Sequence, residues 1–223
     1  MLDTTAISAK ERQLALQSYD ILHSAQEKLF DDLAELAAYI FSVPVARIAF
    51  VGTVEVWHKA GVGMPAQERM APEQTLCSQA VLAEAPVLVF EELNTMPATA
   101  ATQERAVRFY AGAPVRTAQG LAIGTVCLAG YEPRQFSAAE QQVLTQLATL
   151  VMRALEARQR LRKAGEAAWE QLRETAEATL HNQMAVVRYL KARSEGEVPV
   201  PAELLEPIAK RLEEVADVLR QAE

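Results

Sequence analysis

The clearest alternation of apolar and polar positions lies between residues 108 and 130, in the stretch RFYAGAPVRTAQGLAIGTVCLAG. Apolar and small residues alternate on either side of residues 117–120, as in two antiparallel strands joined by a tight turn that contains glycine. We therefore predict that this stretch is the central hairpin of a β-sheet. Its many small residues leave room above the strands, either for a packed helix or for a small ligand.

Two helices are predicted before this hairpin, over residues 8–22 and 29–41. In the second helix, apolar residues recur every three or four positions and therefore share one face. Pro44 ends the pattern, because a proline disfavours the helical conformation of the residue before it. We expect both helices to cover one face of the sheet.

The remaining strands are predicted from short runs of β-branched and aromatic residues. Residues 45–51 and 54–60 form a first hairpin, and residues 87–90 form a short strand. Residues 61–75 have the composition of a loop, residues 76–82 that of a short helix, and residues 94–106 that of a crossover. This order predicts an α+β fold, with an antiparallel sheet and helices segregated to its faces.

The C-terminal part is predicted to be helical. Ser137 and Glu140 have the spacing of a capping box, which begins a helix. A near-heptad apolar stripe follows over about fifty residues, with Gly165 as its weak point, as is typical of a coiled coil or a helical bundle. Residues 194–201 form a turn, and a last amphipathic helix covers residues 204–219. A two-helix hairpin has little core of its own, so we predict that two copies pair into a four-helix bundle, as a homodimer.

Size and charge narrow the class of protein. The 223 residues fit one domain over residues 1–160 and a smaller helical module over residues 161–223. A net charge of −7 and a pI near 5.2 argue against binding to nucleic acid, which requires a clustered basic face. The N-terminus lacks a secretory signal, and no apolar run is long enough to span a membrane. We expect a cytoplasmic protein that binds neither membrane nor nucleic acid.

Several motifs occur together in one order: VWHKAGVGM, TLCSQAVL, the 108–130 hairpin and PRQFS. Over residues 8–158 the chain resembles bacterial GAF domains, particularly those with WFKA, SFC, FYAGAPL-x-T-x-x-G and LGTLCV signatures. The resemblance implies a GAF/PAS-like fold with about six antiparallel strands, a pocket on one face of the sheet and terminal helices on the other. It also implies a role as a sensor or regulatory module in bacterial signal transduction.

The same resemblance implies a set of pocket residues. Matched motif by motif, the family's pocket falls on six side chains: Trp57, Lys59, Cys77, Arg108, Tyr110 and Cys127. His58 stands where WFKA has an aromatic residue. The ligand of this pocket is not identified by the sequence, and the alternative is that the pocket is filled by the protein's own side chains. Because no Cys-His pair occurs, we expect no covalently attached bilin.

The C-terminal hairpin resembles, more weakly, the dimerisation and phosphotransfer hairpin of two-component histidine kinases. His181, in the run LHNQMAVVRYL, is the candidate phosphoacceptor, and a response regulator or a kinase is then a possible partner. Asn182 stands where that family commonly has an acidic residue. No glycine-rich ATP-binding domain follows the hairpin, so autokinase activity is not expected.

Cys77 and Cys127 allow two interpretations. Their number and spacing fit neither a disulfide scaffold nor a zinc module, so reduced thiols are expected. They are either small buried hydrophobic residues or reactive thiols, and the sequence shows no cationic neighbour that would lower a thiol pKa.

No phosphate-binding loop, HExxH or GxSxG motif is present, so we expect neither an enzyme nor a metal site. We predict a sensory module that signals through a dimeric coiled coil, with a phosphotransfer component or a structural dimeric adaptor as the alternatives.

Overall fold

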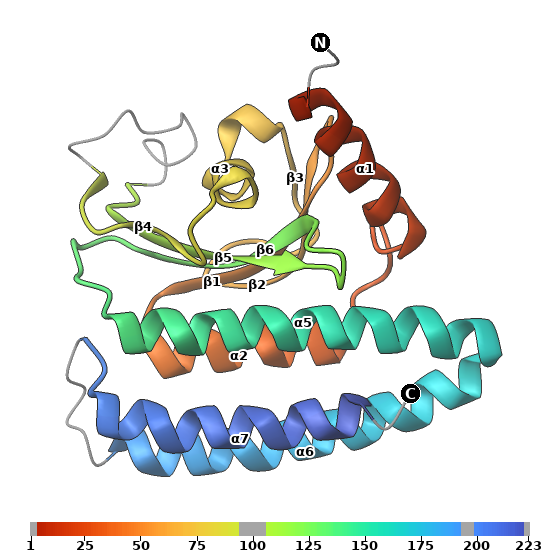
Figure 1. Ribbon diagram of the computed structural model, residues 1–223. Helices are drawn as coiled ribbons and strands as arrows, with labels where there is room; N and C mark the ends of the chain where they lie inside the picture. Colours follow the sequence, from red (N-terminus) through yellow and green to blue (C-terminus); the bar gives the residue numbers. More distant parts are fainter. Residues whose placement is uncertain (1–3, 94–105, 193–198, 221–223) are drawn as a thin grey trace.

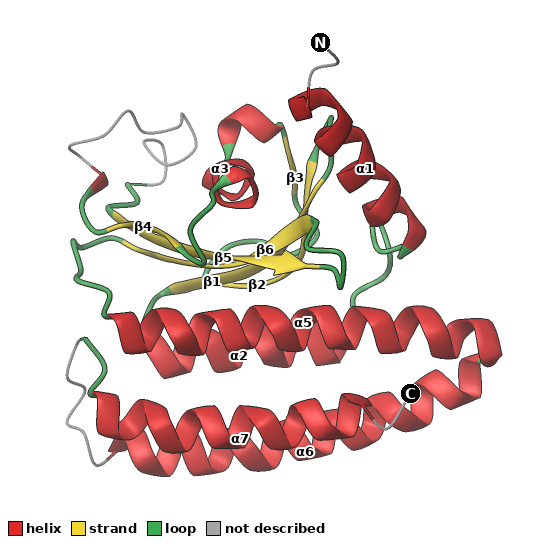
Figure 2. Cartoon of the chain, viewed as in Figure 1, coloured by secondary structure: helices red, strands yellow, loops and turns green. Residues whose placement is uncertain are grey.

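The computed structural model describes residues 4–93, 106–192 and 199–220. One six-stranded antiparallel sheet lies at the centre, with strand order β3-β2-β1-β6-β5-β4 (Figures 1 and 2). The strands are β1 (Val45–Val51), β2 (Val56–Val62), β3 (Arg69–Met70), β4 (Leu88–Phe90), β5 (Phe109–Arg116) and β6 (Ala122–Gly130). The helices are α1 (Thr4–Ser18), α2 (Lys28–Phe41), the short η1 (Pro72–Gln74), α3 (Leu76–Leu82), α5 (Ala138–Ala164), α6 (Glu166–Ala192) and α7 (Ala202–Arg220).

The central hairpin is confirmed. β5 and β6 pair along their length, from Phe109 opposite Gly130 to Arg116 opposite Ala122. β6 also pairs with β1, so the hairpin lies in the middle of the sheet rather than at its edge. The predicted crossover lies outside the described residues except for Ala106, and so does most of the predicted turn at 194–201.

The first hairpin, β1 and β2, is also confirmed, but its second strand begins at Val56 rather than at residue 54. Residues 52–55 form the turn, in which the backbone N–H of Gly52 donates to the carbonyl of Glu55 at 2.8 Å. The predicted loop over 61–75 is partly wrong, because it contains β3 and η1. β3 pairs with β2 and forms one edge of the sheet.

Both N-terminal helices were predicted to cover one face of the sheet, but only α2 does so. α2 packs beneath the sheet beside α5, whereas α1 lies at the end of the sheet near the β1–β2 turn (Figure 1). The backbone N–H of Thr53 in that turn donates to Oε1 of Gln13 at 2.9 Å. α1 lacks a continuous apolar face: Leu16 is fully buried, but Leu14 is 57% exposed. This explains why it does not lie under the strands.

The long apolar stripe does not form one continuous helix. α5 ends at Ala164, and α6 begins at Glu166 and folds back beneath it (Figure 1). Gly165, between them, has φ = +137°, a backbone conformation that residues with a side chain rarely adopt. The weak point in the stripe is therefore a sharp reversal.

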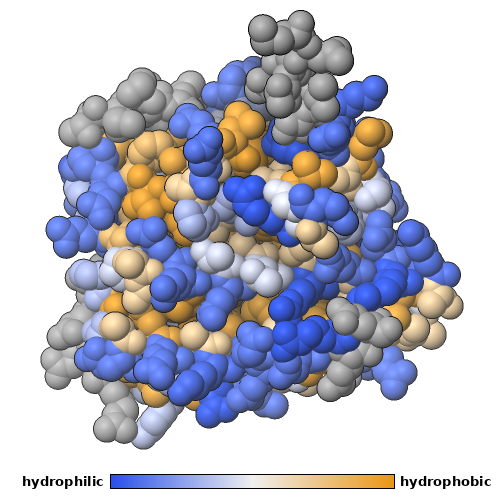
Figure 3. Space-filling view, viewed as in Figure 1, coloured by the Kyte–Doolittle hydropathy of each residue, from blue (hydrophilic) through white to orange (hydrophobic). Residues whose placement is uncertain are grey.

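The predicted four-helix bundle is formed within one chain. The hairpin of α6 and α7 packs against α2 and α5, and one continuous hydrophobic core joins these four helices to the sheet. The apolar residues of the hairpin that are fully buried there are Ala176, Leu180, Val187, Ile208 and Val215. α5 is buried on two sides, because it lies between the sheet and the hairpin. The surface over α5 and α7 is mostly hydrophilic (Figure 3).

This packing corrects the reasoning behind the predicted dimer. We expected a second copy to cover the apolar face of the hairpin, but α2 and α5 of the same chain cover it. The homodimer itself stays a prediction. In the described ranges, no helix combines the length and the apolar character needed to cross a membrane.

Candidate functional site

Three of the six predicted pocket residues meet on the sheet face beneath α3. Cys77 comes from the first turn of α3, Tyr110 from β5 and Cys127 from β6, and each is at most 5% exposed. The hydroxyl of Thr75 caps α3 by accepting a hydrogen bond from the backbone of Ser78 at 3.3 Å. The sulfur atoms of Cys77 and Cys127 are 3.7 Å apart.

Two further side chains, Arg47 and His58, complete this group. The strand register places Arg47 on β1 directly opposite Cys127, and Cys127 directly opposite Gly112 on β5. Residues opposite one another in adjacent strands share a face of the sheet. His58 on β2 is 2% exposed and lies opposite Ala49, which packs in the small core around α3.

The position of the Tyr110 ring explains why one of the small residues in the central hairpin, Gly112, is a glycine. A Cβ atom at this position would lie 2.5 Å from the hydroxyl oxygen of Tyr110 and 2.9 Å from the ring carbon that carries it. Such contacts are far shorter than van der Waals distances. The Tyr110 ring therefore lies flat along β5, over the space that this glycine leaves.

A small cavity of about 70 Å³ lies among these side chains, and Arg47, His58, Cys77, Tyr110 and Cys127 are all in its lining. The Tyr110 hydroxyl interacts there with the two thiols, which are weak hydrogen-bond partners. Arg47 donates through Nη2 to the carboxylate of Glu68 at 2.8 Å, and its Nε atom has no partner among the described residues. The cavity therefore brings polar and ionisable side chains together against an apolar wall.

The two thiols are inequivalent. A hydrogen bond from Cys127 lowers the pKa of Cys77 well below the ordinary value for a thiol, and a smaller contribution comes from His58. The same hydrogen bond, together with burial, raises the pKa of Cys127. The hydrogen bond between the two sulfurs therefore favours a thiolate at Cys77 and a thiol at Cys127. Burial raises the pKa of Tyr110 well above its ordinary value, so the phenol stays protonated.

The tautomer of His58 follows from its backbone contact. Its Nδ1 atom lies 3.1 Å from the carbonyl oxygen of Glu68, which can only accept a hydrogen bond. Nδ1 therefore carries a proton, and Nε2 is the nitrogen left to interact with the Cys77 thiol. No cationic neighbour of either thiol was expected from the sequence; in the structure, the pKa of Cys77 is lowered chiefly by Cys127 and less by His58.

Trp57 and Lys59 do not line this cavity. Both alternate with His58 along β2, and the register between β1 and β2 shifts at this point. The Trp57 ring contacts the His23 ring edge to face, with 4.9 Å between ring centroids. Lys59 is fully buried and donates to the hydroxyl of Ser24 at 2.8 Å and to the carboxylate of Glu27 at 2.9 Å.

Glu27 joins Lys59 to a second buried cation, Arg158 of α5. Nε of Arg158 donates to both carboxylate oxygens, at 2.9 and 3.1 Å, and Arg158 is 2% exposed. Its Nη1 donates to the carbonyls of Tyr19 and Asp20. This ion-pair network fixes the loop before α2 to both β2 and α5, which gives Lys59 a structural role.

Arg108 lies at the start of β5, outside the cavity. It is 36% exposed and pairs with the carboxylate of Glu92 at 2.8 Å. His181, the candidate phosphoacceptor, is exposed on α6, whereas its neighbours Leu180 and Met184 are buried. His181 therefore lies on the face of the helix that a partner could reach.

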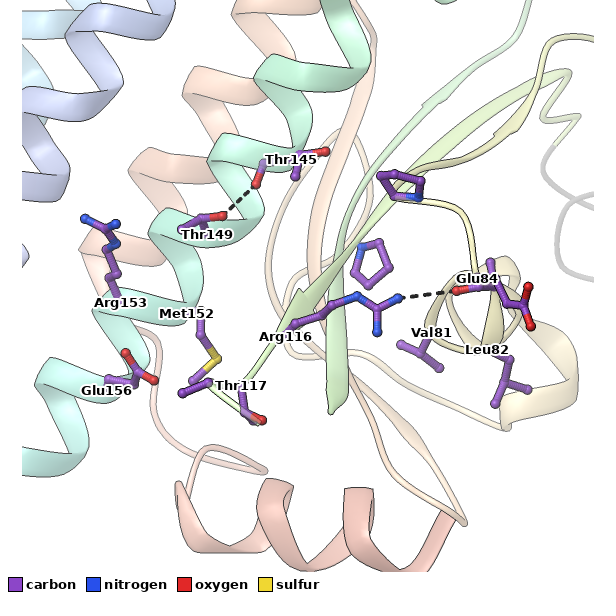
Figure 4. A pocket seen from close by; sticks show the side chains of 14 residues that line it. Val81, Leu82, Glu84, Arg116, Thr117, Thr145, Thr149, Met152, Arg153 and Glu156 are labelled. Atoms are coloured by element: carbon purple, nitrogen blue, oxygen red, sulfur yellow. Dashed lines mark hydrogen bonds between the residues drawn. The ribbon is translucent and has the colours of Figure 1, made fainter. Parts of the chain in front are cut away.

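A second and much larger groove, of about 970 Å³, lies between the end of α3, the end of β5 and α5 (Figure 4). None of the six predicted residues lines it. Its prominent cation, Arg116, donates to the backbone carbonyls of Gly120 at 3.1 Å and Ala83 at 3.3 Å. Arg153 and Glu156 project from α5 on the opposite wall (Figure 4). The lining of the groove also includes Thr117 and Arg153, each with a buried polar atom that has no partner among the described residues.

Within the described part of the chain, no three His, Cys, Asp or Glu side chains are grouped so that they could hold a metal ion. Of the side chains that form the cavity, the sequence analysis missed Arg47 and the role of His58. The alternation in VWHKA could have placed His58 opposite Trp57 and Lys59. No sequence signal distinguished Arg47 from a solvent-exposed strand residue.

The fold has well-defined relatives. The GAF domain of an Acinetobacter phosphoenolpyruvate-protein phosphotransferase is 14% identical, covers 70% of this chain and 95% of that structure, and superposes with a TM-score of 0.50. The blue-light absorbing form of the PixJ GAF domain of Thermosynechococcus elongatus is 13% identical, covers 74% and 95%, and also has a TM-score of 0.50. At such identities the likeness concerns the fold alone.

A cyclic di-GMP phosphodiesterase of Pseudomonas aeruginosa is similar in sequence, with 28% identity over 149 residues, or 63% of this chain and 24% of that protein. The chain thus spans about a quarter of the length of this relative. The family model described as "GAF domain" matches residues 20–156, which include every strand and the whole cavity. The chain therefore belongs to the GAF domain family.

Proposed function

We propose that this chain is a regulatory module of a bacterial signalling protein, in which a small molecule held beneath α3 controls the helical layer on the other side of the sheet. The observation that carries the proposal is the cavity of about 70 Å³, in which two thiols, an imidazole, a phenol and a guanidinium group meet among apolar side chains. Ligand sites of this kind combine an apolar wall with a few convergent polar groups.

The connection from the cavity to the helices supports this proposal. β6, which carries Cys127, leads through a short link to the capping box of α5. Glu140 in that box is fully buried. Its carboxylate accepts from the backbone of Ser137 at 2.8 Å, from the backbone of Val200 at 3.1 Å, and from Arg134. One side chain therefore ties the start of α5 to the segment that leads into α7.

The sequence relative offers further support. It is named as a cyclic di-GMP phosphodiesterase, and the matched part is only about a quarter of its length. A module of this size within a longer signalling protein is consistent with a regulatory role. That this chain is not itself an enzyme, and that it is cytoplasmic, stay predictions.

Native mass spectrometry of the freshly purified, reduced chain tests the proposal. We expect a retained small molecule, and its loss in Ala129→Leu, because Ala129 lines the cavity and a larger side chain would fill it. Ala168→Leu, on the exposed face of α6, is the matched control and should leave the bound molecule in place. Equal retention in both variants would show that the molecule binds elsewhere. An empty wild-type protein whose stability no metabolite alters would favour the structural adaptor.

The same spectra report the oligomeric state, and a dimer would bear out the predicted pairing of two copies. The exposure of His181 supports a second candidate function, phosphotransfer with a response regulator. Incubation with a phosphorylated response regulator should then label the wild-type chain but not His181→Gln. Equal labelling of the two chains, or none, would exclude this function.

A further inference from the structure

The pair of thiols beneath α3 has an arrangement that binding alone does not require. Cys77 lies on a helix and Cys127 on the central strand of the sheet, 50 positions apart in sequence, yet their sulfurs are 3.7 Å apart. A disulfide bond is about 2.05 Å long, so a modest side-chain movement would bring the sulfurs within bonding distance. Both side chains line the same cavity and are almost fully buried.

The groups around the sulfurs favour reaction at one of them. The hydrogen bond at Nδ1 leaves Nε2 of His58 to take the proton of Cys77. The hydrogen bond to Cys77, together with burial, favours the thiol form of Cys127. A thiolate beside a neutral thiol is the usual arrangement of an attacking and a resolving cysteine.

We propose that Cys77 and Cys127 are a redox-sensitive pair, in which a small hydroperoxide enters the cavity, oxidises Cys77, and leaves a disulfide between the two residues. This inference rests on the proposed sensory role of the cavity and adds a hydroperoxide as a reactive input, distinct from a molecule that stays bound in the reduced protein. The cavity is large enough for hydrogen peroxide and too small for a bulky organic hydroperoxide.

The chemistry balances in two steps. First, Cys77 gives its proton to His58 and attacks one peroxide oxygen. The S–O bond forms, the O–O bond breaks, and the leaving hydroxide takes the proton back from His58 as water. Second, the Cys127 sulfur attacks the sulfenic sulfur. The S–S bond forms, the S–O bond breaks, and the leaving hydroxide takes the Cys127 proton as a second water. Two thiols are oxidised, and one peroxide is reduced to two waters.

The structural consequence is a covalent bond between α3 and β6. In the reduced protein, the first turn of α3 contacts the sheet through side-chain packing and the weak hydrogen bond between the sulfurs. In the oxidised protein, α3 can no longer move away from β6. A short link joins β6 to the start of α5. Oxidation would therefore restrict the movement of β6, the strand through which the cavity is connected to the helical layer.

The test uses the full reduced chain, treated with stoichiometric hydrogen peroxide and then alkylated in denaturant. For the wild type we expect loss of both free thiols in a monomeric product that is 2 Da lighter, with a linked peptide containing Cys77 and Cys127. Cys127→Ala should instead give a sulfenic acid at Cys77 that dimedone traps. Cys77→Ala should keep its remaining thiol. Circular dichroism checks that both variants fold, and the linked peptide requires no variant at all.

The rates at which different peroxides oxidise Cys77 distinguish a reaction inside the cavity from unspecific oxidation of exposed thiols. Cumene hydroperoxide should react at least about tenfold more slowly than hydrogen peroxide, because it does not fit the cavity. His58→Gln should slow the reaction near pH 7 by about tenfold for each unit by which the thiol pKa rises. Thiols that persist in the wild type, products linked between chains, or equal rates for the two peroxides would overturn the proposal. None of these outcomes affects the native mass spectrometry of the reduced protein, so the proposed function is tested separately.

Discussion

The two faces of the sheet bury polar groups in different ways. On the α2 and α5 face, Lys59, Glu27 and Arg158 form a network in which each charge has an opposite partner. On the α3 face, Cys77, Tyr110 and Cys127 interact mainly with one another, through weak sulfur hydrogen bonds. Charge-assisted hydrogen bonds hold elements in one arrangement, whereas thiols held by weak contacts stay available for reaction. The Glu27 network therefore has a structural role, and the thiol pair has a chemical one.

The largest expected effect comes from breaking the network on the α5 side. Glu27→Gln would leave Lys59, which is fully buried, and Arg158, which is 2% exposed, without a counter-charge. Removing one partner of a buried ion pair costs about 3–5 kcal/mol, and we expect a loss of that size in the free energy of unfolding measured with urea. Glu35→Gln, on the exposed side of α2, should change it by less than about 0.5 kcal/mol. Similar losses in the two variants would remove the distinction between the faces.

A smaller effect is expected from crowding the α3 face. Gly112→Ala would bring a methyl group within 2.5 Å of the Tyr110 hydroxyl oxygen. Overpacking of this kind destabilises by about 1–3 kcal/mol. The double variant with Tyr110→Phe should recover part of that loss, because the closest atom is gone, and thermal unfolding of the four proteins gives the coupling energy. If the free-energy changes of the two single variants simply added in the double variant, Gly112 would not be needed to make room for the Tyr110 ring.

Removing the Tyr110 hydroxyl should have almost no effect on stability. This hydroxyl is buried and has only the two thiols as weak partners, so Tyr110→Phe removes a desolvation penalty along with the oxygen. We expect the free energy of unfolding to change by less than about 0.5 kcal/mol or to rise slightly. A loss above about 1.5 kcal/mol would indicate a strong internal hydrogen bond, and the α3 face would then resemble the other face.

The smallest effect is a pH dependence on the helical side. Burial, with a smaller contribution from Arg134, lowers the pKa of Lys191 from 10.5 to about 8. Between these values the unfolded chain holds a proton that the folded chain has lost, so stability rises with pH in this window. Relative to Lys191→Met, the wild type should gain at most about 0.5 kcal/mol between pH 7.5 and 9.5, since solvent screens this half-buried group. A constant or falling difference in urea titrations would contradict this.

Much of the fold could be predicted because it depends on local patterns. The 108–130 hairpin shows two runs of apolar and small residues on either side of a turn that contains glycine, and the capping box of Ser137 and Glu140 is present as predicted, with hydrogen bonds of 3.2 and 2.8 Å. The role of Gly165 was not predictable in the same way. A stripe of one period is compatible both with one long helix and with two antiparallel helices. The two arrangements differ in whether α6 and α7 pack against the side of α2 and α5 that faces away from the sheet. That packing is a tertiary property, which the periodicity of one segment does not show.

The candidate site could be predicted only in part, for a related reason. The family motifs named Cys77, Tyr110 and Cys127, and these three side chains line one cavity in the structure. The motifs also included Trp57 and Lys59, which the register shift beside Lys59 and the Glu27 network direct elsewhere. Arg47 and His58 join the cavity through strand pairing. Arg47 lies opposite Cys127, and His58 lies opposite Ala49, in strands far apart in sequence. The local composition around each residue does not show which strand will pair with it.

The reversal at Gly165 has a topological consequence. A single residue connects two helices of 27 residues each, so the chain has almost no slack at this point. If the two helices straightened into one rod, α6 and α7 would leave α2 and α5 together, and the apolar residues that these helices now bury against one another would be exposed. Short connections of this kind are where proteins exchange identical segments between molecules. The positive φ of Gly165 therefore keeps the four helices packed within one chain.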